Sequence, residues 1–167
     1  MSRDADATAF HGGQMALHLV MDDKTYMELA LAEAKKAAAR GEVPVGAVIV
    51  KNGAVIAAAH NEVEKRHDAT AHAEILALRR ASDLTGDWRL SGCTLYVTLE
   101  PCCMCAGAMV NTRLDRVVFG AFDERYGCCF SLLELTNNVL SHTVETIGGV
   151  CEAECAALLN AYFQKKR

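Results

Sequence analysis

Two short motifs in the 167-residue chain carry the residue types of a metal site, His-Ala-Glu at 72–74 and Pro-Cys-Cys-Met-Cys at 101–105. Cys102 and Cys105 have C-x-x-C spacing, which places both sulfur atoms on one side of the first turn of a helix. A helix N-terminus also favours thiolate over thiol through its dipole and its free N–H groups. Because His72 begins a different segment, two helix starts that face each other would supply one nitrogen and two sulfur ligands.

Three ligands of this kind leave one position open on a tetrahedral zinc ion, which is typical of catalytic rather than structural sites. A water molecule in that position has a pKa of about 7, so hydroxide forms at neutral pH. Glu74 points away from the ligand direction on a helix, so we expect it to reach the water and the substrate instead of the metal. The motifs thus predict one zinc ion per chain, bound by His72, Cys102 and Cys105, with Glu74 as the acid–base residue.

Two other interpretations of these motifs explain fewer of the residues. Buried thiols beside a core histidine would not require both motifs at predicted helix starts. A redox C-x-x-C pair explains neither His72 nor Glu74. The combination of H-x-E with P-C-x-x-C is instead typical of zinc-dependent nucleobase deaminases, in which the glutamate is not a ligand.

The elements that must position the motifs follow from hydrophobic periodicity. A helix is predicted over 22–40, with Gly41 at its C-terminal cap, and another over 71–82, with Thr70 as N-cap. Apolar runs at 45–50 and 54–60 flank Asn52-Gly53 and predict a β-hairpin.

The rest of the chain continues the alternation of strands and helices. Strands are predicted at 94–99, 116–120 and 143–147, and helices from 101 through 110, at 131–135 and at 152–166. Trp88 and Tyr96 are expected in the core. This order predicts an α/β sandwich, and the opening hairpin makes its sheet mixed.

Composition excludes several classes of protein. Hydrophobic residues make up 51% of the chain and charged residues 23%, which excludes a disordered chain. The net charge is −4, which excludes a globally basic nucleic-acid binder but leaves local basic patches open. No secretory signal and no apolar run of about 18 residues is recognisable, so we expect a cytoplasmic protein, without a membrane partner, whose eight cysteines are reduced. Residues 1–21 are expected to form a disordered extension and residues 22–167 a single domain.

The segments HDATAHAE at 67–74 and TLEPCCMCAGAM at 98–109 closely resemble the bacterial tRNA-specific adenosine deaminases of the cytidine deaminase-like superfamily. Further similar stretches lie at 41–48, 60–61, 116–121 and 154–159, so the resemblance runs from about residue 22 to the end. It implies a three-layer α/β/α sandwich with a five-stranded mixed sheet, a homodimer, and deamination of the wobble adenosine of a tRNA anticodon to inosine. It also implies the zinc ligands and the proton shuttle named above. Residues that match substrate contacts of the family are Asn61, Asp123, Ser141 and His142.

Two positions depart from the family pattern. Phe130 stands where these enzymes usually carry a glycine before the serine, and Ser141 stands where an asparagine usually precedes the histidine. Both lie in loops that the resemblance places near the anticodon. The departures therefore concern RNA contacts and leave the zinc chemistry unchanged.

Two other functions compete with the tRNA hypothesis. A deaminase of a free base or nucleoside, such as guanine, cytosine or cytidine, would use the same zinc site, and the acidic net charge fits it. A non-catalytic zinc-stabilised subunit would have no need for Glu74. The run at 104–109 and Asn61 favour a tRNA substrate.

Two residue sets have open roles. One is a group of basic residues that form either a phosphate-binding surface or ordinary solvated faces: Lys65, Arg66, Arg113, Arg116, Arg125, Lys165, Lys166 and Arg167. The other set contains four cysteines and a histidine, which either form a second metal site or are small apolar side chains beside an unrelated histidine. Their spacing is not that of a zinc finger. The set comprises Cys128, Cys129, Cys151, Cys155 and His142.

Overall fold

The computed structural model describes residues 21–137 and 140–166. The helices in this part of the chain are α1 (Asp23–Ala39), α2 (Val63–Arg66), α3 (Ala73–Thr85), α4 (Cys103–Asn111) and α5 (Glu152–Lys165). The strands are β1 (Gly46–Lys51), β2 (Ala54–His60), β3 (Cys93–Leu99), β4 (Arg116–Ala121) and β5 (Glu145–Ile147). The predicted extension at 1–21 lies outside the described residues except for Met21, which packs against the core.

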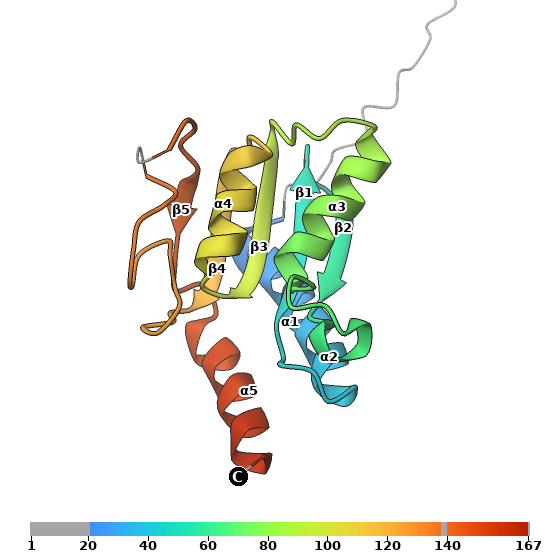
Figure 1. Cartoon of the computed structure of the whole chain (residues 1–167), viewed down its shortest axis with the longest axis vertical. Helices are drawn as coiled ribbons and strands as arrows, with labels where there is room; N and C mark the ends of the chain where they lie inside the picture. Colours follow the sequence, from blue (N-terminus) through green and yellow to red (C-terminus); the bar gives the residue numbers. More distant parts are fainter. Residues whose placement is uncertain (1–20, 138–139, 167) are drawn as a thin grey trace, which may run out of the picture.

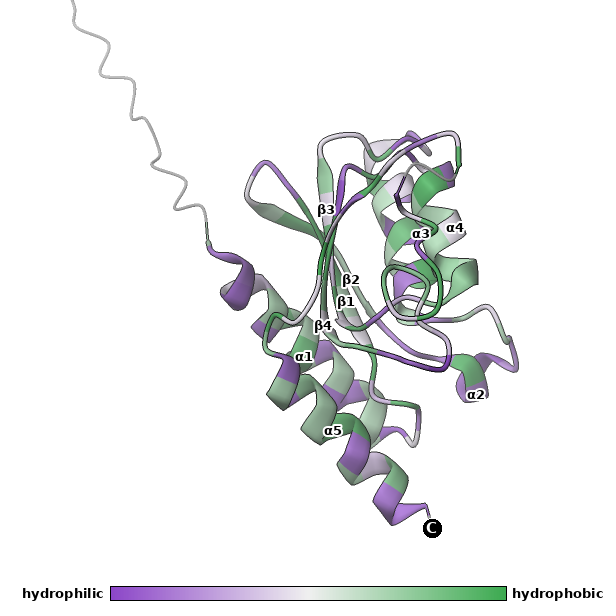
Figure 2. Ribbon diagram, turned by 90° about the vertical axis from the view of Figure 1, so that its left-hand side faces the viewer, coloured by the Kyte–Doolittle hydropathy of each residue, from purple (hydrophilic) through white to green (hydrophobic). Residues whose placement is uncertain are grey.

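The strands form one mixed sheet in the order β2-β1-β3-β4-β5. β1 is antiparallel to β2 and β3, whereas β4 is parallel to β3 and β5. Asn52 and Gly53 have φ values of 51° and 77°, which is the left-handed geometry of the predicted hairpin turn. Helices α1 and α5 cover one face of the sheet and α3 and α4 the other (Figures 1 and 2), which confirms the three-layer α/β/α sandwich with five strands.

The core lies between these layers and is built from apolar side chains of the sheet and the covering helices. Its largest fully buried members include Met27, Ile49, Leu95, Met109 and Phe119. No described helix combines the length and the apolar composition that a membrane span needs.

Helix α1 packs unusually close to the beginning of β1. A Cβ atom at Gly46 would lie 2.1 Å from the carbonyl oxygen of Ala30 and 2.4 Å from the amide nitrogen of Ala34. Only glycine therefore fits there, and the contact fixes α1 against the end of the sheet that carries the site.

Helix α3 begins later than the sequence predicted. Thr70 does not cap it, because the Thr70 hydroxyl donates to Asp68 Oδ1 at 2.7 Å and the Thr70 amide donates to the same atom at 2.8 Å. The N-cap is His72, whose backbone is extended (φ −70°, ψ 152°). Because the helix begins at Ala73, His72 lies just outside it with an extended backbone.

Two further predictions were wrong. Residues 131–135 form turns, because the amides of Leu132 and Leu135 donate to the carbonyls of Gly127 and Cys128 rather than in a helical pattern. The Trp88 side chain is 52% exposed, and the Arg89 guanidinium lies 4.2 Å from its ring centroid, so Trp88 is not a core residue. Tyr96 is buried as predicted.

The strand register places four chain segments at one edge of the sheet. The end of β2 pairs with the beginning of β1. The beginning of β1 also pairs with the end of β3, and the parallel strands β3 and β4 end side by side. The chain leaves this edge at Asn61 after β2, at Cys102 after β3 and at Asp123 after β4. Residues distant in the sequence are thereby brought to one place.

Candidate active site

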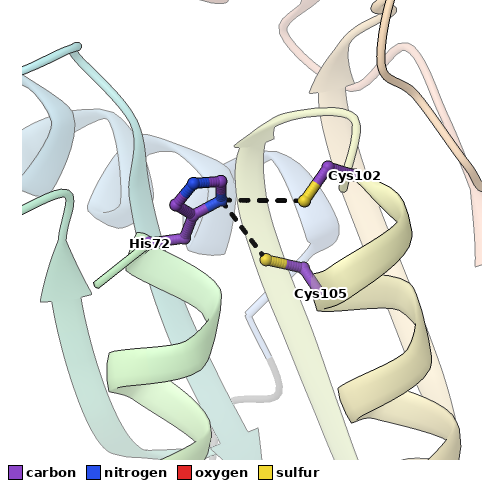
Figure 3. Close-up of side chains that lie close together, drawn as sticks. All are labelled: His72, Cys102 and Cys105. Carbon is purple, nitrogen blue, oxygen red and sulfur yellow. Dashed lines mark hydrogen bonds between the residues drawn. The ribbon is translucent and has the colours of Figure 1, made fainter. Parts of the chain in front are cut away.

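His72, Cys102 and Cys105 form a cluster between the N-termini of two helices. His72 is the N-cap of α3 and Cys102 is the N-cap of α4. The His72 Nδ1 atom lies 3.7 Å from Cys102 Sγ and 3.6 Å from Cys105 Sγ (Figure 3). The structure thus brings together the three residues that the sequence predicted as ligands, at the starts of two helices that each begin two residues later than predicted.

The cluster has the dimensions of a tetrahedral zinc site. Zn–N and Zn–S bonds of about 2.05 and 2.3 Å at tetrahedral angles separate a nitrogen and a sulfur ligand by about 3.6 Å. The two nitrogen–sulfur distances in the cluster match this value, and all three ligand atoms lie within 4.8 Å of one another. One histidine and two cysteines therefore fit zinc and leave a fourth position for water or substrate.

The charges of the cluster also favour a cation. Hydrogen bonds from Cys105 and His72 lower the pKa of Cys102 to about 4, whereas the hydrogen bond with Cys102 and burial raise the pKa of Cys105. The hydrogen bond with Cys102 also raises the pKa of His72. Two adjacent thiolates repel each other, so both sulfur atoms lose their protons together only when a cation lies between them.

Glu74 lies beside the cluster, in the first turn of α3. Its side chain is buried, with 4% exposure, and it lines the same cleft as His72 and Cys102. Burial raises the pKa of its carboxyl to about 7. A group with this pKa accepts and releases protons near neutral pH, as an acid–base residue must.

The cluster opens into a cleft of about 1180 Å³, comparable to or larger than typical small-molecule sites. Asn61 and Asp123 both line it, so the structure brings these two predicted substrate contacts to the histidine–cysteine cluster. The Asn61 amide group donates to Glu42 Oε2 at 3.2 Å, and its backbone N–H donates to the Val45 carbonyl at 3.0 Å. Asn61 is therefore held in one orientation.

Ser141 and His142 lie elsewhere. The Ser141 hydroxyl accepts a hydrogen bond from Arg113 at 3.1 Å, and His142 Nε2 lies 2.7 Å from the carbonyl oxygen of Leu114. Arg113 and Leu114 follow the C-terminal end of α4, whereas Cys102 is at its N-terminal end. The structure therefore does not bring Ser141 and His142 to the cleft.

Sequence reasoning missed two buried carboxylates that line the cleft, Glu42 and Glu100, which are 1% and 2% exposed. Glu42 accepts the backbone N–H groups of Glu64 and Lys65, at 3.2 and 2.8 Å, and so caps the short helix α2. Glu100 likewise accepts N–H groups of a loop. The only sequence signal was their position, since Glu100 directly follows β3 and Glu42 lies in the segment that leads into β1, both at the end of the sheet that carries the site.

The basic residues divide into two kinds. Arg125 and Lys166 line the cleft. Arg66 binds Glu62, and Arg116 donates to both carboxylate oxygens of Asp23, at 2.9 and 2.7 Å. Arg125 and Lys166 thus supply positive charge at the cleft, whereas Arg66 and Arg116 are engaged in ion pairs.

Comparison with known proteins places the chain in a family. A family model described as MafB19-like deaminase matches residues 21–167. A tRNA-specific adenosine deaminase of Bacillus subtilis is 51% identical over 146 residues, which cover 87% of this chain and 91% of the relative.

Solved structures agree with this assignment. One, from a study of A-to-I editing by tRNA:A34 deaminases at the wobble position of transfer RNA, has a TM-score of 0.78 at 43% identity and covers 81% of this chain and 99% of that one. The X-ray structure of guanine deaminase from Bacillus subtilis has a TM-score of 0.59 at 40% identity. This match covers 61% of the present chain and 66% of the guanine deaminase chain. The chain belongs to the MafB19-like deaminases by its family model and to the tRNA-specific adenosine deaminases by its relatives.

Proposed function

We propose that this protein converts the wobble adenosine of a tRNA anticodon to inosine by hydrolysis, releasing ammonia, with one zinc ion bound by His72, Cys102 and Cys105. The observation that carries this proposal is the position of the buried Glu74 carboxyl beside the nitrogen–sulfur cluster, at the wall of a cleft. Membership in the tRNA-specific adenosine deaminases supports the choice of substrate.

The chemistry follows from the groups at the cleft. Zinc, when bound, lowers the pKa of a coordinated water to about 7 and thereby supplies a nucleophile at neutral pH. Glu74 accepts a proton from the attacking water and delivers a proton to N1 of adenine as C6 is attacked. Glu74 then takes the proton of the new C6 hydroxyl and delivers it to the departing amino group, so that C6 keeps a carbonyl oxygen and ammonia leaves. A carboxyl whose pKa lies near 7 suits transfers in both directions.

The remaining cleft residues hold the substrate. The wobble base of an anticodon is unpaired, so inserting it into the cleft costs less free energy than flipping a base out of a duplex. Asn61, fixed by Glu42, is placed to orient the base beside Glu74. Asp123 and Arg125 face the same cleft and would contact the flanking nucleotides. Ser141 and His142 stay predictions, as contacts to RNA outside the cleft.

Two accompanying features belong to the same proposal. A tRNA substrate is consistent with a cytoplasmic protein, and the family resemblance implies a homodimer. Light scattering of the purified, zinc-loaded protein measures its mass directly. A mass of one chain at micromolar concentration would contradict the dimer without affecting the proposed chemistry.

The substrate is tested by parallel assays of the purified protein. One assay uses tRNA with adenosine at the wobble position, and the others use free adenine, guanine, cytosine and their nucleosides. We expect inosine in the tRNA and no ammonia from the free compounds. Ammonia only from guanine would identify a guanine deaminase, and no ammonia from any substrate, with zinc bound, would identify a non-catalytic subunit.

A further inference from the structure

The Glu100 carboxylate lies at the centre of a loop. Its Oε1 atom accepts the backbone N–H groups of Cys129, Phe130 and Ser131, at 3.2, 2.7 and 2.8 Å. Its Oε2 atom accepts the N–H of Asp123 at 3.0 Å and the hydroxyl of Ser131. One carboxylate thus binds both the beginning and the end of residues 123–131, here termed the cleft loop.

The cleft loop is also attached to the segment that carries a zinc ligand. The amide of Cys128 donates to the carbonyl of Pro101 at 2.8 Å, and Gly127 forms a β-bridge with Cys102. Within the loop, the amide of Gly127 donates to the carbonyl of Asp123 at 2.8 Å. These backbone bonds and the Glu100 carboxylate together join the cleft loop to the N-terminal end of α4.

The outer side of the cleft loop faces the cleft. Asp123, Arg125 and Tyr126 all line the cleft, and the Tyr126 side chain is 68% exposed. These residue types contribute a carboxylate, a cation and an aromatic ring, which suit contact with an RNA loop. Their distance from Glu74 depends on where the cleft loop is held.

Gly127 shows how closely the cleft loop fits around the carboxylate. A Cβ atom at this position would lie 2.3 Å from Cδ and 2.4 Å from Oε2 of Glu100, and 2.5 Å from the carbonyl oxygen of Asp123. Gly127 is not among the glycines with positive φ. Glycine is required here because the Glu100 carboxylate fills the space that a Cβ atom would occupy. The backbone dihedral angle would allow other residues.

We propose that Glu100 is a positioning residue for the RNA substrate. Its carboxylate fixes the cleft loop relative to the zinc-binding start of α4, and it thereby sets the affinity for RNA without taking part in the chemistry. This inference rests on the proposed function, because it takes the anticodon loop as the ligand of the cleft.

Glu100→Gln is the sharpest single test. Glutamine keeps the volume and presents one acceptor oxygen, but its NH2 group cannot accept the N–H of Asp123. Without that bond the beginning of the cleft loop is released. We expect the KM for an anticodon stem-loop RNA to rise about tenfold or more, from the loss of charge-assisted hydrogen bonds, while kcat changes less than about threefold and zinc stays at one per chain.

The matched control is Asp115→Asn. Asp115 Oδ2 also accepts a backbone N–H, from Gly92 at 2.9 Å, but at the opposite edge of the sheet. This variant makes the same exchange of a carboxylate that accepts a backbone N–H for an amide, and we expect it to leave KM unchanged. Amide hydrogen exchange adds a local measurement: the amide of Asp123 should exchange faster in Glu100→Gln, and those of β1 should not.

Gly127→Ala tests the same contact from the loop side and remains informative if Glu100→Gln fails to fold. We expect a similar rise in KM, whereas Gly107→Ala, where an added Cβ meets nothing within 4 Å, should have no effect. Because both substitutions disturb one contact, the double variant should raise KM no more than the stronger single one.

The proposal is overturned if Glu100→Gln and Gly127→Ala lower thermal stability but leave KM for RNA unchanged. It is also overturned if activity falls in proportion to zinc content, since Glu100 would then act through Cys102. The unsubstituted protein is assayed first. If it forms no inosine in RNA, the proposed function fails, whereas an active parent with unaffected variants refutes only the role of Glu100.

Discussion

The two ends of the central sheet carry different kinds of polar structure. At the end where β2, β3 and β4 finish, buried carboxylates organise the chain: Glu42 caps α2, Glu74 lies beside the ligand cluster and Glu100 holds the cleft loop. At the opposite end, exposed side chains bond to nearby loops: Arg113, for example, donates to the carbonyl and the hydroxyl oxygen of Ser141. The side chains at the cleft end are therefore held in fixed positions, whereas those at the far end are exposed to solvent.

The difference has a physical origin. Loops that leave a sheet lose the ladder partners of their N–H groups, and a buried N–H must find another acceptor. At the far end, exposed side chains bond to the loops directly. At the cleft end, the loops pack around the buried carboxylates of Glu42 and Glu100, which accept their N–H groups. The same carboxylates bind Asn61 and Asp123 and thereby hold both residues in defined positions at the cleft.

Removal of the metal should have the largest effect. Dialysis against a zinc chelator, or Cys105→Ser, should abolish inosine formation, because no other described group at the cleft activates water in this way. Metal analysis and activity before and after Zn2+ is restored provide the measurement. Full activity in a metal-free protein would show that the cleft end is not a metal site. Cys93→Ser, a buried cysteine at the far end of β3, is the matched control.

Glu74→Gln should rank next. The amide has the size of the carboxyl but neither accepts nor delivers the proton, so kcat should fall by about 10²- to 10⁴-fold. Zinc content and KM for the RNA stem-loop should stay close to those of the parent protein. Single-turnover formation of inosine is the measurement. A kcat within threefold of the parent would remove Glu74 from the mechanism.

Asn61→Ala and Ser141→Ala form a pair that compares the two ends directly. Loss of a buried, oriented amide at the cleft should lower kcat/KM by about 10- to 100-fold. Loss of the Ser141 hydroxyl should change it less than about twofold, because that hydroxyl bonds to Arg113 at the far end. Both variants are assayed with the same RNA stem-loop. Equal losses would mean that RNA contacts extend over both ends of the sheet.

Asp23→Asn should have no effect on kcat/KM and should act only on stability. Hydrogen bonds from Arg116 lower the pKa of Asp23 despite its partial burial, and Tyr96 adds to this. A depressed folded-state pKa contributes stability above the unfolded value of about 3.9, which is lost as the pH falls through the folded value. The variant's Tm should therefore be below the parent's at pH 7, and the gap should shrink below about pH 4. A constant gap down to pH 2 would contradict this linkage.

Much of the fold was predictable because its signals are local. The Asn52-Gly53 turn, the apolar runs and the helical periodicity of α1 depend on neighbouring residues, and the structure confirms each. The boundary of α3 was not predictable, since Thr70 binds Asp68 instead of capping the helix. The exposure of Trp88 was missed because no local pattern reports which side of a loop faces solvent.

The sequence by itself determined the proposed ligand set, because Cys102 and Cys105 are adjacent on one helical turn and the H-x-E motif offers a third candidate ligand together with a candidate acid–base residue. Only the tertiary structure decided which other residues join them. Register and strand order place Asp123 beside the cleft and Ser141 at the opposite edge. They also bring Glu100 to residues about 30 positions further along the chain. Such contacts depend on long-range pairing of strands, which spacing along the chain does not record.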